Sequence, residues 1–81
     1  MEIENMPEAK PGNVVPNEWY LILEDQRTYT MESGDIVTVL DGRKLRVSDR
    51  DTHYIEDSRG NLHIIRNTWT HVVIAEMEDP R

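Results

Sequence analysis

The 81-residue chain contains no cysteine and no phenylalanine, and each absence narrows the ways in which it can fold. Without cysteine, neither a disulfide nor a thiolate zinc site can hold the structure together. Without phenylalanine, two tryptophans and three tyrosines are the only aromatic rings for both core and surface. Apolar residues make up 37% of the chain, which suffices for one small core and not for two.

Long hydrophobic runs are also missing. No run approaches the roughly 20 apolar residues that cross a bilayer. The first residues, MEIENMPEAKPG, are acidic and lack the basic start and apolar centre of a signal peptide. We therefore expect no membrane segment and a cytoplasmic location.

Positive charge is scarce, because 9 lysines and arginines stand against 16 aspartates and glutamates, for a net charge of −7. Nucleic-acid binding draws much of its affinity from phosphates neutralised by basic side chains. Nucleic acid is therefore not the expected partner. The same acidity is compatible with a surface that imitates nucleic acid and competes with it for a basic protein.

The chain divides into a tail, one domain and a short end. Residues 1–16 hold three of the four prolines and show no periodicity, which predicts a flexible acidic tail. Over residues 17–77, short apolar runs alternate with turn residues, and no helix candidate exceeds one turn. This pattern predicts a single all-β domain, followed by a C-terminal tail over 78–81.

Two turns set the expected strand pairing. Asp41-Gly42 separates the apolar runs 35–40 and 43–48, and a two-residue turn there would pair the two runs as a hairpin. One face of that hairpin would then form the core, with Ile36, Thr38, Leu40, Leu45 and Val47 on it.

The second expected turn ends at Gly60 and pairs 52–57 with 61–66. This register places Ile55 opposite His63 and His53 opposite Ile65. Residues 67–70, Asn-Thr-Trp-Thr, then suit a single 3₁₀ turn before a last strand over 71–77.

The stretches WYLILEDQRTYTMESGDIVTVL and SRGNLHIIRNTWTHVVI resemble the two halves of an SH3-like barrel over residues 18–76. GDIVTVLDG also resembles the opening of a KOW-type motif, from a related small barrel of ribosome and transcription proteins. The resemblance implies a small antiparallel barrel with one 3₁₀ turn. Together with the strand pattern and the composition of residues 1–16, the expected fold is a barrel of five to six strands with a disordered N-terminal tail. The resemblance implies no ligand residues, because the aromatic groove of peptide-binding SH3 domains is missing.

Catalytic and metal-binding groups are weakly indicated. His53 and His63 would share a face near Asp51, which is a minimal ligand set for a divalent metal, but ordinary surface histidines explain the pattern as well. Serines occur only in predicted turns, without a motif around them. A barrel of this size has little room for a pocket of the roughly 300 Å³ or more that ligands use. We expect neither an enzyme nor a metal or other cofactor.

The predicted binding residues are one aromatic pair and one basic cluster. Alternation along a strand must turn either Trp19 or Tyr20 outward, and aromatic side chains commonly anchor protein interfaces. The basic cluster consists of Arg43, Lys44, Arg46 and Arg50.

From these features we expect a non-enzymatic protein-binding module, or a small accessory or inhibitor protein, that acts through the barrel surface. One alternative is a KOW-like nucleic-acid binder that uses the basic cluster. The other is an acidic mimic of nucleic acid, which requires a continuous patch of Glu18, Glu24, Asp25, Glu32, Asp35, Glu56 and Asp57. An exposed strand edge would also permit a homodimer.

Overall fold

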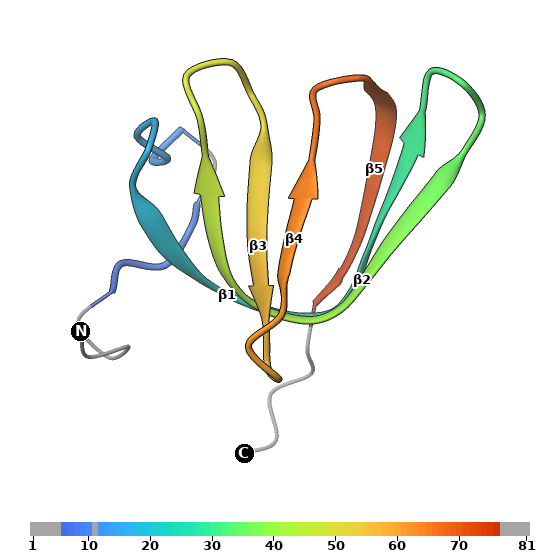
Figure 1. Cartoon of the computed structure of the whole chain (residues 1–81). Coiled ribbons are helices and arrows are strands. Elements are labelled where there is room, and N and C mark those ends of the chain that lie inside the picture. Colours follow the sequence, from blue (N-terminus) through green and yellow to red (C-terminus); the bar gives the residue numbers. More distant parts are fainter. Residues whose placement is uncertain (1–5, 11, 77–81) are drawn as a thin grey trace.

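The computed structural model describes residues 6–10 and 12–76, and these form one antiparallel sheet of five strands without a helix (Figure 1). The strands are β1 (Trp19–Met31), β2 (Ile36–Val47), β3 (His53–Asp57), β4 (Leu62–Ile65) and β5 (Trp69–Glu76). Their order in the sheet is β4-β3-β2-β1-β5, so the last strand pairs with the first. The all-β prediction is confirmed. The sheet is not closed, because β4 and β5 are not paired within this part of the chain.

The hairpin predicted at Asp41-Gly42 is wrong. The chain passes straight through both residues as part of β2, and Gly42 pairs with Glu24 of β1 on one side and Asp57 of β3 on the other. Asp41 does take a positive φ of 55°, but as an irregular residue inside a strand rather than as a turn. The first hairpin instead closes at Gly34, whose N–H donates to the carbonyl of Met31.

Close packing explains why a glycine stands at position 42. A Cβ there would lie 3.1 Å from Cδ1 of Ile22 and 3.3 Å from Cγ2 of Ile55, so a larger residue would crowd the core. Figure 1 shows β1 and β2 bending sharply in the lower part of the view. The pairing of β1 shifts at the same level, between Leu21 and Glu24 and again before Gln26.

Because no turn interrupts β2 at Asp41-Gly42, the predicted core face is wrong for the residues before this point. Before it, Val39 is buried, whereas Ile36 and Leu40 are 67% and 48% exposed. After it, Leu45 is buried as predicted. The buried side chains Val39 and Leu45 thus lie at odd-numbered positions on both sides of Asp41-Gly42, whereas the predicted two-residue turn would have switched the core from even to odd positions.

The hairpin predicted at Gly60 is confirmed, together with its register. Gly60 has φ 85° and its N–H donates to the carbonyl of Asp57. His53 lies opposite Ile65, and Ile55 lies opposite His63.

The segment expected to form a 3₁₀ turn is a bend at Asn67, and Trp69 already belongs to β5. Two hydrogen bonds hold this bend. The Asn67 side chain donates to the carbonyl of Arg50 at 2.7 Å, and the N–H of Glu32 donates to the carbonyl of Thr68 at 2.7 Å.

Part of the expected tail contacts the sheet. Glu8 forms a parallel bridge with Leu21, and Met6 is buried. The N–H of Ala9 donates to the carbonyl of Leu21, and the N–H of Leu21 donates to the carbonyl of Pro7. Backbone bonds of this kind leave no periodic trace in the sequence. Residues 1–5, 11 and 77–81 lie outside the described residues, as do the corresponding parts of the predicted tails.

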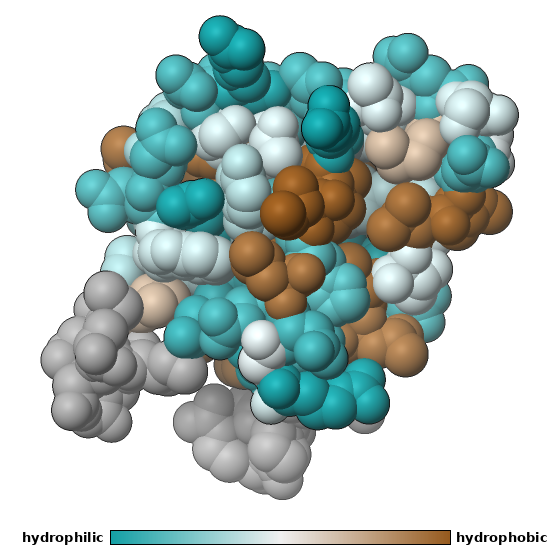
Figure 2. All heavy atoms as spheres, viewed as in Figure 1, coloured by the Kyte–Doolittle hydropathy of each residue, from teal (hydrophilic) through white to brown (hydrophobic). Residues whose placement is uncertain are grey.

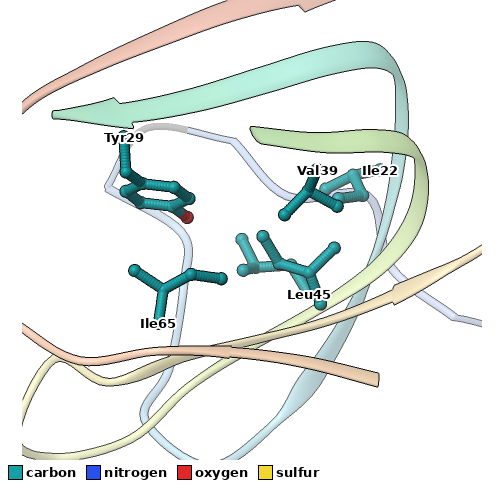
Figure 3. Packing of buried hydrophobic residues seen from close by; sticks show 6 residues of the cluster. Ile22, Tyr29, Val39, Leu45 and Ile65 are labelled. Atoms are coloured by element: carbon teal, nitrogen blue, oxygen red, sulfur yellow. The ribbon is translucent and has the colours of Figure 1, made fainter. Parts of the chain in front are cut away.

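The core lies on the concave side of the sheet (Figure 3). Its buried side chains come from four strands: Ile22, Tyr29, Val39, Leu45, Ile55 and Ile65. Trp69 and Val72 of β5 pack against this cluster from the fifth strand. The described residues contain no helix with the length and hydropathy needed to cross a membrane.

Candidate functional site

The outer face of β1–β4 carries two rows of side chains, each crossing all four strands in register. We call these eight residues the platform. The first row is Trp19, Arg46, Tyr54 and Ile64, and the second is Leu21, Lys44, Glu56 and Leu62. The row between them points inward and is buried at Tyr20, Leu45 and Ile55, which fixes the platform as the opposite face.

Arg46 lies between two aromatic rings in the first row. Its Cζ is 5.3 Å from the ring centroid of Trp19 and 4.4 Å from that of Tyr54. Each such cation–π contact contributes about 0.5–1 kcal/mol at an exposed site and more where water is excluded. Three side chains from three strands thus hold one another in fixed positions on the surface.

The guanidinium of Arg46 is incompletely hydrogen-bonded in this arrangement. Its Nε is buried and has no hydrogen-bond partner among the described residues. Stacking between rings, rather than pairing with a carboxylate, therefore holds this side chain. The row presents its aromatic rings and one positive charge together.

The second row has no net charge, and its end on β4 is apolar. Lys44 and Glu56 form an ion pair at 3.2 Å. Beyond it, Leu62 and Ile64 of β4 are 53% and 59% exposed. Figure 2 shows apolar side chains gathered over β4 in the middle of the view, with polar side chains around them. An exposed apolar centre beside fixed aromatic rings has the composition of a protein-binding surface.

The structure brings together three of the six predicted binding residues: Trp19, Lys44 and Arg46. Tyr20 is the inward member of the aromatic pair, is 4% exposed, and accepts a hydrogen bond from the N–H of Val15 at 2.6 Å. Arg43 donates to the carbonyl of Gly42 at 2.9 Å, and Arg50 lies in the loop between β2 and β3. These three residues do not belong to the platform.

Sequence reasoning missed Tyr54 and Ile64 as surface residues. The confirmed register around Gly60 places these two residues opposite each other, so the signal was available in the hairpin itself. The sequence did not show which face of β3 and β4 the core would cover.

A group of hydrogen-bonded polar side chains lies on the inner face of the sheet. Arg27 donates to both carboxylate oxygens of Glu24, at 2.9 and 2.6 Å, and to the hydroxyl of Tyr29 at 3.1 Å. That hydroxyl lies 2.6 Å from Nδ1 of His53, and the His53 ring centroid lies 4.4 Å from that of Trp69. We call these five residues the buried network.

Burial sets the protonation of this network. It lowers the pKa of His53 to about 4, with a further contribution from the charge of Arg27. Burial also raises the pKa of Tyr29. Burial alone would lower the pKa of Arg27. The hydrogen bond to Glu24 and the contacts with Tyr29 together exceed this effect, so the pKa of Arg27 is raised. Arg27 donates to the Tyr29 hydroxyl, and a second hydrogen bond joins this hydroxyl to Nδ1 of neutral His53.

Each member of the buried network thus contacts another member. The hydrogen bonds join β1 to β3, and the contact between the His53 and Trp69 rings connects β3 to β5. This arrangement ties strands together rather than presenting a group to solvent. Glu24 and Arg27 are 4% and 6% exposed.

The two histidines considered for a metal site do share the inner face, but they have different partners. His63 Nε2 lies 2.9 Å from Oδ2 of Asp57, whereas His53 faces Tyr29. The hydrogen bond to His63, with others from the backbone N–H groups of Asn61 and Arg59, holds the pKa of Asp57 well below its usual range. Asp57 therefore stabilises the turn at Gly60.

Comparison with known proteins yields no relative. No family model, no curated protein and no solved structure matches the chain. The functional proposal consequently depends on the geometry of the platform and on the charge of the chain.

Proposed function

We propose that this chain is a non-enzymatic protein-binding module, of the kind found in small accessory or inhibitor proteins, and that it binds its partner protein through the platform. The stacked triple of Trp19, Arg46 and Tyr54 carries this proposal. Tryptophan, tyrosine and arginine are the residue types that most often dominate the binding energy of protein interfaces.

Rigidity supports the same function. A side chain that must be immobilised on binding costs about 0.5–1.5 kcal/mol of the affinity. Arg46 and its two rings already hold one another across three strands. Leu62 and Ile64 add exposed apolar area next to them, and the Lys44–Glu56 pair places both charges at its side.

We also propose that the sheet is a member of the SH3-like barrels. Supporting features are the five consecutive antiparallel strands, the pairing of the last strand with the first, and the strong bend of the two long strands. This fold is compatible with the binding function and does not by itself imply it.

The two alternatives are less well supported. An acidic mimic needs a continuous patch, but Glu24 and Asp57 are buried and Glu56 is paired with Lys44. A nucleic-acid binder needs free cations, whereas Lys44 is paired, Arg46 lies between rings, and the net charge is −7. A protein partner requires neither.

Comparative affinity capture tests the proposal. Wild type, Trp19→Ala, Tyr54→Ala and a control, Ile36→Ala, are immobilised and exposed to lysate of the source cells, with and without nuclease treatment. Ile36 is 67% exposed and lies outside the platform. We expect the same protein on wild type and control and its loss from both platform variants, each shown to be folded by circular dichroism. Equal capture by all four chains would contradict the proposal, and capture that disappears with nuclease treatment would favour the nucleic-acid binder.

A further inference from the structure

β5 forms a long edge of the sheet. Among the described residues, β1 is the only strand paired with it, so the hydrogen-bonding groups along its other side are free. Its sequence, WTHVVIAE, contains no proline, lysine or arginine, which are residues that commonly protect strand edges. The pairing from His71 to Ala75 is regular, so no bulge interrupts this run.

Exposure on both faces distinguishes β5 from the opposite edge. Residues 73–76 are all exposed, whichever face they lie on. Ile74 lies beside Arg27 in register, yet it is 45% exposed, and Val73 is 52% exposed. By contrast, β4 is only four residues long and ends on buried Ile65. Of the two edge strands, β5 is thus the longer one and the one with exposed apolar side chains on both faces.

Acidic residues lie at both ends of this edge. Glu32, whose N–H donates to the carbonyl of Thr68, is exposed near the start of β5. Asp25 and Glu76 are exposed at its other end, where Glu76 pairs with Glu24. A second copy of the chain would bring a further net charge of −7 to the same edge, which disfavours self-pairing. A basic segment would meet complementary charge.

We propose that β5 receives an extended, basic segment of a partner protein, which adds to the sheet as a further strand. Backbone hydrogen bonds along the edge would provide affinity, and side chains on the two faces of the segment would cover Val73 and Ile74, which lie on opposite faces of β5. This surface is separate from the platform, so it stands or fails independently of the proposed function.

A synthetic strand tests the proposal with the full chain. The probe is a peptide of alternating valine and threonine flanked by two lysines at each end. One control peptide carries N-methyl groups on alternate residues, which removes backbone donors, and another replaces the lysines with glutamates. Binding is followed by NMR and by hydrogen exchange of the backbone amides. A chain variant with Val73→Lys and Ala75→Lys, checked by circular dichroism, supplies a charged edge.

We expect the basic peptide to slow exchange of amides within residues 71–76. Affinity should fall about tenfold or more for both control peptides and for the lysine variant. Failure of the basic peptide to bind at millimolar concentration would overturn the proposal, as would protection confined to the platform. Sedimentation that shows the chain pairing with itself through β5 would also overturn it, because the edge would then be occupied by a second copy.

Discussion

Replacing Glu24 with alanine tests the buried network. Arg27 is 6% exposed, and both of its contacts with a negative charge are to Glu24. Without Glu24, the guanidinium remains in the protein interior. The hydroxyl of Tyr29 is then its only hydrogen-bond partner among the described residues. Removing one member of a buried ion pair typically costs about 3–5 kcal/mol, because the other charge is left uncompensated.

This cost is large for so small a domain. At about 0.05–0.15 kcal/mol per residue, a chain of this length has a free energy of unfolding of roughly 4–12 kcal/mol. Glu24→Ala should therefore remove about a quarter of the stability or more. Urea unfolding followed by tryptophan fluorescence measures the loss, since the Trp69 ring centroid lies 5.3 Å from that of Tyr29.

The chain offers a matched control. Lys44 and Glu56 also form an ion pair, but their side chains are 26% and 35% exposed, and Lys44→Ala should cost only about 0–1 kcal/mol. Replacing Glu24 and Arg27 together with leucine removes both charges and should recover most of the lost stability. Equal losses for Glu24→Ala and Lys44→Ala, with no recovery in the double variant, would refute the reasoning.

Two further predictions concern pH and packing. The pKa of His53 is about 4 in the folded chain and about 6.5 when unfolded, so the unfolded state binds more protons between these values and stability should fall as the pH drops from about 6.5 to 4. The full shift corresponds to about 3.4 kcal/mol, and partial exposure of the ring reduces our expectation to about 2 kcal/mol. Thermal unfolding at several pH values measures this loss of stability. His53→Gln should flatten the dependence of stability on pH, whereas His71→Gln, at an exposed position, should not. An unchanged slope in His53→Gln would contradict the prediction. Gly42→Ala should destabilise the fold by about 1–3 kcal/mol, since the new Cβ would lie 3.1 Å from Ile22 and 3.3 Å from Ile55. Urea midpoints measure this effect against Thr38→Ala, an exposed position of the same strand. A cost no greater than that of the control would show that position 42 has room.

The two predicted glycine turns, one wrong and one confirmed, show how far local sequence can predict this fold. Gly60 belongs to a hairpin whose strands are adjacent in sequence, so its register could be derived from the turn alone. Asp41-Gly42 carries the same kind of signal, but its positive φ serves an irregularity within a strand. The deciding contacts, with Ile22 and Ile55, come from other strands, and no local pattern contains them.

The candidate site was predictable to a similar extent. Alternation correctly implied that one of Trp19 and Tyr20 faces outward, but not which one. The stacking of Arg46 between Trp19 and Tyr54 joins three strands, so it depends on the register of two separate pairings. Glu24 and Arg27, three residues apart on one strand, would be expected on opposite faces. The shift in pairing between them turns both inward.

Site-specific crosslinking tests the central claim, that the platform binds a protein, most directly. A photo-crosslinking amino acid is placed at Ile64, on the platform and 59% exposed, or at Ile36, outside it and 67% exposed. We predict that illumination in nuclease-treated lysate of the source cells joins one protein to position 64 and not to position 36. Excess wild type should compete with this product and Trp19→Ala should not. Identical products at both positions, or none at position 64, would contradict the account.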